Sequence, residues 1–156
     1  MSDESPIIFI RTDASLIIGS GHVARCLTLA ETLRDSGATV RFVCRNHPGN
    51  LNDIIIKKGF ETHVLPGLNL KENQVESIDQ NVNMVEGYNH WINVNQGQDA
   101  AEMLGVLSGI KPDWLIVDHY GLDYDWEILL RPYVHKLMAI DDLANRQHDC
   151  DLLLDQ

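Results

Sequence analysis

Short hydrophobic runs alternate along this chain with segments of helical periodicity. The first run, residues 7–10, is apolar and mostly β-branched, which is typical of a strand buried on both faces. Further strands are predicted at residues 39–44, 61–65, 114–117, 137–140 and 152–154.

The segments between these runs predict helices. In residues 23–33 the apolar side chains fall on one helical face, with Cys26 among them as a core residue, and Gly37 follows as a helix stop. Further helices are predicted at residues 51–58, 99–107 and 123–130, the last two capped by Asp99 and Asp123. The alternation predicts one α/β domain over residues 1–156, a Rossmann-like parallel sheet flanked by helices.

Residues 68–98 have the weakest pattern of the chain. They are rich in Asn, Gln and Glu, and they contain Tyr88 and Trp91. So long a loop in a compact domain is usually functional or mobile. A functional loop and an irregular surface excursion with Trp91 packed back onto the domain are both consistent with the residues.

Polar side chains follow the predicted strands at the same end of each strand. They are Asp13, Asp118, His119, Tyr120, Asp141 and Asp142. Because ligands of open parallel sheets bind at the carboxyl edge of the strands, we expect this edge to carry the site. The topology can bring Asp13, His119 and Tyr120 close to His22, although the four are far apart in sequence. The other histidines form no recognisable constellation, and we interpret them as structural or exposed.

His22 follows a loop that contains Gly19, Ser20 and Gly21, and it stands at the start of the predicted helix. The partial positive charge there attracts anions and disfavours a protonated imidazole, so His22 is a candidate general base. The loop has neither the third glycine of a dinucleotide fingerprint nor the Lys-Ser/Thr of a P-loop. An ordinary loop in which His22 is a capping or surface residue is the competing interpretation.

Composition narrows the class of protein. Three cysteines, an odd number without paired spacing, indicate a reducing compartment, and the start of the chain lacks the features of a signal peptide, so we expect a cytoplasmic protein. A net charge of −11 opposes binding to nucleic acid or anionic membrane. Asp141 and Asp142 are more typical of turn caps than of a metal or acid–base pair, so we expect no metal and no cofactor.

Three sequence blocks carry a resemblance to a known family. They are RTDAS-x-x-IGSGHVARCLTLAETLR at residues 11–34, VDHYGLD at 117–123 and IDDLANRQHDCDLLLDQ at 140–156. In this order, they resemble the N-terminal half of the PseG family. These proteins are UDP-2,4-diacetamido-2,4,6-trideoxy-β-L-altropyranose hydrolases of pseudaminic acid biosynthesis, related in fold to the MurG glycosyltransferases.

The resemblance implies the N-terminal domain of a glycosyltransferase-B fold. By this resemblance, His22 matches the proposed general base of the family. It would activate a water that attacks the anomeric carbon and releases UDP with inversion, without a metal. Positions at the sheet edge and helix start, some matched by the blocks, are expected to bind the UDP-sugar: Asp13, Gly19, Ser20, Gly21, Arg25, Asn46, Trp91, His119 and Tyr120.

The family also has a second, C-terminal domain that binds most of the nucleotide, and residues 1–156 do not include it. We therefore expect this domain to fold alone, with little or no hydrolysis. An apolar patch on the surface that faces the missing domain would favour a dimer.

Two other functions fit the same residues. The chain could be the acceptor-binding half of a MurG-like glycosyltransferase, in which His22 would activate a sugar hydroxyl instead of water. It could also be a non-catalytic sugar-nucleotide binding domain.

Overall fold

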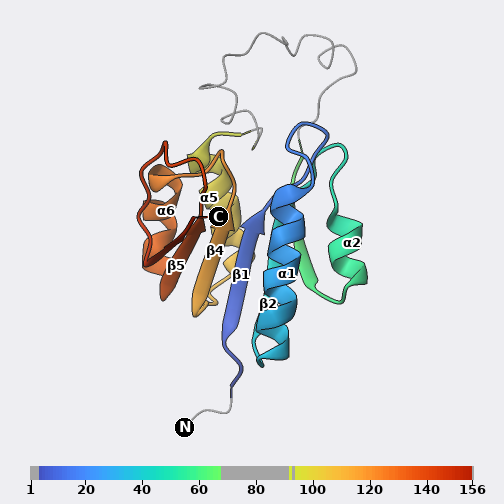
Figure 1. Ribbon diagram of the computed structural model, residues 1–156. Coiled ribbons are helices and arrows are strands. Elements are labelled where there is room, and N and C mark those ends of the chain that lie inside the picture. The colour runs from blue at the N-terminus through green and yellow to red at the C-terminus, as the bar shows by residue number, and fades with distance from the viewer. Residues whose placement is uncertain (1–3, 68–91, 93, 156) are drawn as a thin grey trace.

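The described residues form a six-stranded sheet in the order β3-β2-β1-β4-β5-β6. Figure 1 shows β1 between β2 and β4, with β5 beyond β4. The computed structural model describes residues 4–67, 92 and 94–155. The strands are β1 (Ile7–Thr12), β2 (Thr39–Arg45), β3 (Glu61–Leu65), β4 (Trp114–Asp118), β5 (Lys136–Ile140) and β6 (Leu152–Leu154). All neighbouring strands are parallel, which confirms the predicted Rossmann-like α/β class.

The helices agree with the pattern except at one start. They are α1 (Gly21–Asp35), α2 (Asn52–Lys57), α5 (Gln96–Leu107) and α6 (Tyr124–Leu130), followed by a short 3-10 helix, η2 (Arg131–Tyr133). Asp123 caps α6, as expected. The predicted cap at Asp99 is wrong, because Asn95 caps α5 and accepts the Gln98 N–H at 2.7 Å. None of the helices in the described ranges is long and apolar enough to cross a membrane.

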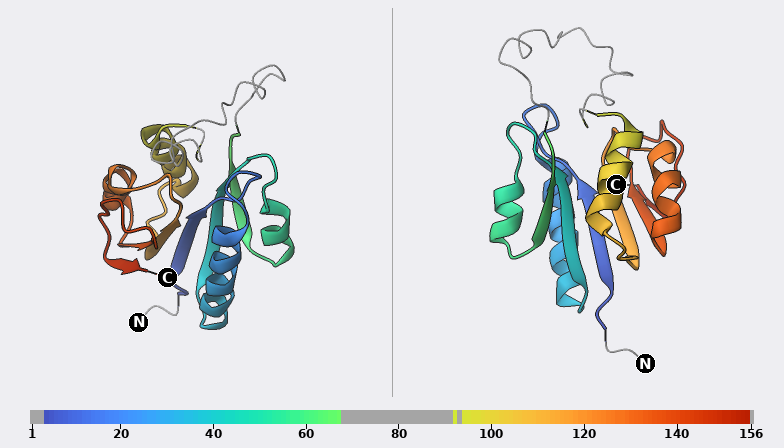
Figure 2. Two further views of the ribbon diagram at one scale, coloured as in Figure 1. Left: turned by 45° about the horizontal axis from the view of Figure 1, so that its top comes forward. Right: turned by 180° about the vertical axis from the view of Figure 1, so that it is seen from behind.

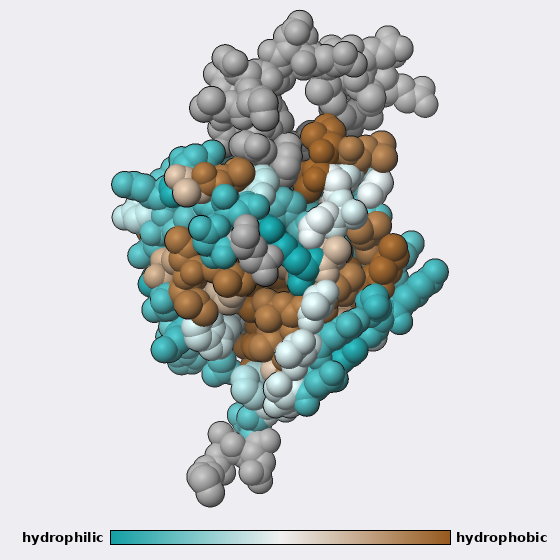
Figure 3. All heavy atoms as spheres, viewed as in Figure 1, coloured by the Kyte–Doolittle hydropathy of each residue, from teal (hydrophilic) through white to brown (hydrophobic). Residues whose placement is uncertain are grey.

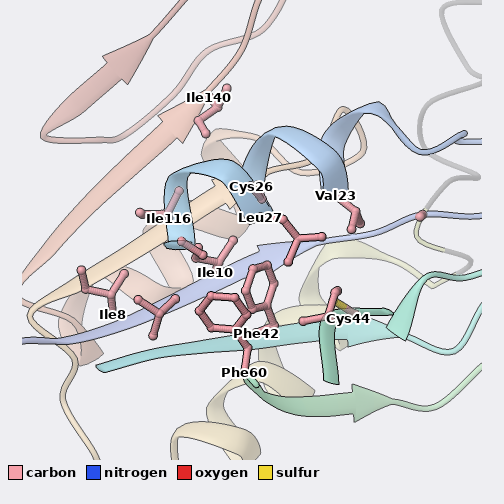
Figure 4. Packing of buried hydrophobic residues seen from close by; sticks show 14 of the residues in the cluster. Ile8, Ile10, Val23, Cys26, Leu27, Phe42, Cys44, Phe60, Ile116 and Ile140 are labelled. Atoms are coloured by element: carbon pink, nitrogen blue, oxygen red, sulfur yellow. The ribbon is translucent and has the colours of Figure 1, made fainter. Parts of the chain in front are cut away.

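The sheet has one hydrophobic core on each face, because successive strand residues point to opposite sides. Ile8 and Ile10 pack with α1 on one face, where Phe42 and Phe60 also meet (Figure 4). Phe9 belongs to the opposite core, with residues of α5 and α6. Figure 2 shows these two helices on the face opposite α1.

The strand order places β1 beside β4 although a long stretch of chain separates them. From β1 the chain moves outward to β2 and β3, then returns to β4 on the other side of β1. Thr12 pairs with Asp118 at the carboxyl ends of these strands. This is the topological switch point of the sheet, where ligands of such folds bind.

The α1 face is only partly covered near β5 and β6. Figure 3 shows hydrophobic residues gathered on the surface beside α1. A groove of about 370 Å³ is found there, lined by Arg25, Thr28, Leu29, Thr32, Ile140 and Leu154. Arg25 places one end of this groove next to the switch point.

Candidate functional site

A histidine–aspartate pair stands at the switch point. His22 belongs to the first turn of α1, and Asp118 is the last residue of β4. The Nδ1 atom of His22 lies 2.6 Å from Oδ1 of Asp118. A carboxylate can only accept, and this contact is much shorter than the 3.3 Å between Nδ1 and Nη2 of Arg25. Nδ1 therefore carries the hydrogen in the neutral ring, and Nε2 is its basic nitrogen.

Arg25 completes this pair from the next turn of α1. Its Nε donates to Oδ2 of Asp118 at 2.5 Å, and its Nη2 donates to Oδ1 at 2.6 Å. Burial would raise the pKa of Asp118, but hydrogen bonds from Arg25 and His22 outweigh burial and lower it. Asp118 is therefore a carboxylate at neutral pH. Arg25, expected to contact the sugar nucleotide, turns its fork toward this carboxylate.

Tyr120 packs against the same histidine. Its ring lies edge-on to the imidazole, with centroids 4.5 Å apart and an interplanar angle of 85°. The phenol donates a hydrogen bond to the carboxylate of Asp142. Burial and this hydrogen bond raise the pKa of Tyr120 to about 12, so the phenol is neutral at physiological pH. The structure thus brings Tyr120 and His22 together, as the topology predicted.

The loop before α1 has a defined shape. Ser15 and Gly19 form an antiparallel bridge, and Gly19 has a φ of 82°, a conformation that glycine adopts without strain. Ser20 stands at the N-cap, and Gly21 begins the helix. In the described part of the chain, the Ser20 side chain forms no capping bond, and the first turn has no acidic residue. The first amides of α1 are therefore suited to an anionic group.

Asp13 lies beneath this surface rather than on it. Only 1% of the residue is exposed, and Oδ1 accepts from Nη1 of Arg11 and from the backbone N–H of Arg45, both at 2.7 Å. Oδ2 lies 2.8 Å from Nε2 of His119 and 3.1 Å from Nε2 of His47. Burial is outweighed by Arg11 and the two histidines, and the pKa of Asp13 falls well below its usual range. These contacts favour a positioning role over direct substrate contact.

His119 is also held on both sides. The backbone N–H of Gly121 donates to Nδ1 at 2.9 Å, so Nε2 carries the hydrogen that is donated to Asp13. Burial lowers the pKa of His119 in spite of the nearby carboxylate. A neutral histidine with both nitrogens engaged supports the loop after β4, and this geometry does not favour the direct substrate contact expected from the sequence.

Asp99 is the main residue that sequence reasoning missed. It binds Nε and Nη2 of Arg11 at 3.2 and 2.7 Å, Nη2 of Arg45 at 2.7 Å and Nε1 of Trp126 at 2.9 Å. Both arginines are fully buried. A signal existed, because an arginine within or at the end of a buried strand needs a carboxylate partner.

A second missed group holds the chain after β5. Asp141 accepts the backbone N–H of Leu143 at 3.0 Å, which confirms the predicted turn-cap role. It also pairs with Arg146 at 3.0 Å and with His148 at 2.7 Å. The other ring nitrogen of His148 lies 2.7 Å from Glu127. His148 therefore belongs to a constellation that the spacing of the histidines did not indicate.

Two predicted contacts are not part of this cluster. Asn46 is exposed after β2, on the side of β1 away from β4, and its side chain accepts from Asn50. Trp91 lies outside the described residues. Within the described ranges, no group of three histidine, cysteine, aspartate or glutamate side chains is arranged to hold a metal ion.

Comparison with known proteins agrees with the motif blocks. No protein-family model matches the chain. The chain is 28% identical over 148 residues to the UDP-2,4-diacetamido-2,4,6-trideoxy-beta-L-altropyranose hydrolase of Campylobacter jejuni. The match covers 94% of this chain and 40% of the hydrolase, so the chain spans less than half the length of this relative. The resemblance predicted from the motifs is thus confirmed: along nearly its whole length, the chain is similar to part of a UDP-sugar hydrolase.

Proposed function

We propose that this chain carries the general base of a UDP-sugar hydrolase. The observation that carries the proposal is the His22–Asp118 pair at the β1–β4 switch point, in a chain similar to a protein named as such a hydrolase. The substrate class would be a UDP-linked 2,4-diacetamido-2,4,6-trideoxyhexose, as in the name of the relative.

In the proposed reaction, Nε2 of His22 takes a proton from a water molecule as the water oxygen bonds to the anomeric carbon. The bond between that carbon and the β-phosphate oxygen breaks, and its electron pair leaves with UDP. Attack from the face opposite UDP inverts the anomeric configuration. The imidazolium that forms is stabilised by Asp118 at 2.6 Å, which also holds the ring in the required tautomer.

Neighbouring groups divide the remaining tasks. Arg25 keeps Asp118 oriented through two hydrogen bonds and compensates its charge. The uncapped amides at the start of α1 are placed to bind charge on the diphosphate, next to the base. UDP is a good leaving group, and these donors would stabilise its negative charge as it departs. For both reasons the reaction has less need of a separate general acid.

Turnover would also need groups outside residues 1–156. The relative is much longer than this chain, and we propose that a second unit supplies most contacts to the nucleotide. The chain alone would then bind the sugar side of the substrate and hydrolyse it slowly or not at all.

The test is release of UDP from the UDP-linked sugar by this chain and by any longer product of the same reading frame. His22→Ala should lower kcat by about 10²- to 10⁴-fold, measured at a temperature where its unfolding curve shows that the variant is folded. Asp118→Asn should cost about 10²-fold or more, because an amide can donate to Nδ1 and select the wrong tautomer. His135→Ala is the matched control, since His135 is exposed just before β5, at the opposite edge of the sheet.

Other outcomes would redirect the proposal. Full turnover by His22→Ala would remove His22 from the mechanism. Transfer to an added acceptor, with a glycoside as product, would identify a glycosyltransferase instead. If the sugar nucleotide raises the melting temperature but neither this chain nor a longer protein from the same reading frame turns it over, the chain is a binding domain.

A further inference from the structure

The segment between β5 and β6, residues 141–151, reaches back over the loop that follows β4. Arg146 makes the closest contacts: its Nη1 donates to the backbone carbonyls of His119 at 3.1 Å, Tyr120 at 2.5 Å and Leu122 at 2.8 Å. Its Nη2 pairs with Oδ1 of Asp141 at 3.0 Å. One guanidinium thus binds three backbone carbonyls of a single loop. Only 11% of the Arg146 side chain is exposed.

Tyr120 lies between this guanidinium and His22. The Arg146 guanidinium carbon is 5.6 Å from the centroid of the phenol ring, and the same ring lies edge-on to His22. The phenol donates to Asp142, which belongs to the same segment as Arg146. The segment therefore holds the backbone and the hydroxyl of Tyr120 and contacts its ring.

The segment is itself braced against α6. His148 lies between Oε2 of Glu127 and Oδ2 of Asp141, at 2.7 Å from each. The backbone N–H of Asp149 donates to Oε1 of Glu127 at 2.6 Å, and Glu127 is fully buried. The contact with His148 holds the Asp141 carboxylate in place, and the same carboxylate pairs with Arg146.

We propose that Arg146 is a positioning residue for His22. It holds the loop after β4 so that Tyr120 sets the orientation of the imidazole. This rests on the proposed function only in calling His22 the base. The third sequence block, in which the only side-chain roles predicted from sequence were turn caps at Asp141 and Asp142, then supports the site through the loop after β4.

The test uses NMR of the His22 and Tyr120 ring signals in the 156-residue chain, so it needs no turnover. Arg146→Lys keeps the charge, but an ammonium lacks the planar fork that reaches three carbonyls and a carboxylate together. We expect the His22 ring signals to move toward those of Tyr120→Ala. Arg131→Lys is the matched control, because Arg131 pairs with Asp149 and Asp151 of the same segment without touching Tyr120.

A double-mutant cycle separates positioning from general loosening. In a Tyr120→Ala background, Arg146→Lys should add no further change to the His22 signals. An unchanged His22 spectrum in Arg146→Lys, or an equal change in both backgrounds, would overturn the proposal. If Arg146→Lys does not fold, Asp141→Asn serves instead: a smaller shift in the same direction supports the proposal, and no shift contradicts it. A catalytically silent His22 would refute the proposed function and leave this result intact.

Discussion

Among the histidine–aspartate pairs that the described residues form at the carboxyl edge of the sheet, the pairs His119–Asp13 and His22–Asp118 differ in their surroundings. In the inner pair, His119 and Asp13 are both at most 3% exposed, and each uses both of its polar atoms on the protein. In the outer pair, Asp118 is buried, but its partners His22 and Arg25 have side chains that are 8% and 23% exposed. The same two residue types thus form a support in one place and a candidate base in the other.

The difference shows what makes such a pair chemically useful. The inner pair is surrounded by Arg11, Arg45 and Asp99, whose charges are compensated within the core. The outer pair stands at a helix start and fixes a single tautomer of its histidine. A histidine beside an aspartate is therefore a candidate base where the pair stands at a helix start on the sheet edge, rather than within a core of compensated charges.

The largest effect is expected from breaking the inner group at Asp99. Asp99→Asn removes the negative charge that Arg11 and Arg45 share, and both arginines are fully buried. Removing one partner of a buried ion pair costs about 3–5 kcal/mol. We expect a loss of that size in the free energy of unfolding, measured by urea denaturation.

Glu102→Gln is the matched control for this experiment. Glu102 lies on the same helix and pairs with the same Arg45, but 23% of its side chain is exposed. Because Glu102 is partly exposed and Arg45 keeps Asp99 in this variant, we expect a smaller loss than for Asp99→Asn. Equal costs for the two variants would mean that burial does not distinguish Asp99.

The fold was predictable because most of its strands contain continuous hydrophobic runs. A strand buried on both faces, such as residues 7–10, needs no partner to be recognised in sequence. The start of α5 was not predictable, because its cap is Asn95 and the acidic residue chosen for that role is buried against two arginines. From sequence, a short polar side chain near the start of a helix looks the same whether it caps the helix or forms an ion pair with a distant strand.

The sequence predicted the position of the site in the fold better than it predicted the role of each residue there. The topology predicted that Tyr120 lies close to His22, as the structure has it. It could not tell that Asp13 lies below the surface, since residues after a strand may face up or down. The contacts of Arg146 and His148 depend on how the segment after β5 folds back, and no periodicity carries that information.

The buried His119 and the half-buried His148 should respond to pH in opposite directions. Burial lowers the pKa of His119, so its contribution to stability is present above its ordinary pKa of about 6.5 and is lost as pH falls through the folded value. Hydrogen bonds to Glu127 and Asp141 raise the pKa of His148 against burial and the Arg146 charge. Its contribution is present below about pH 6.5 and is lost as pH rises through the folded value.

Urea unfolding of two variants from about pH 5 to 8 tests these signs, because other groups cancel in each difference. The stability advantage of the unmodified chain over His119→Gln should shrink toward acid pH. Its advantage over His148→Gln should shrink toward alkaline pH. Parallel curves for the two differences would show that the surroundings of the two histidines do not set their protonation.

The smallest effect is expected at Tyr120, where the ring and the hydroxyl can be separated. Tyr120→Phe keeps the edge-on contact with His22 and removes the hydrogen bond to Asp142. That bond is partly exposed, so we expect a loss of about 1 kcal/mol or less in the free energy of unfolding. The His22 ring signals should stay near those of the unmodified chain, whereas Tyr120→Ala should move them.

This last comparison also separates two roles for the phenol. If the ring orients His22, then UDP release by Tyr120→Phe stays within a few-fold of the unmodified protein, since the packing surface is intact. If the hydroxyl donated a proton to the leaving group, its removal would lower kcat by about 10²-fold or more. The raised pKa of Tyr120, about 12, makes the phenol a weak acid and so favours the orienting role. The outer pair would then depend on a packing contact on one side and a carboxylate on the other.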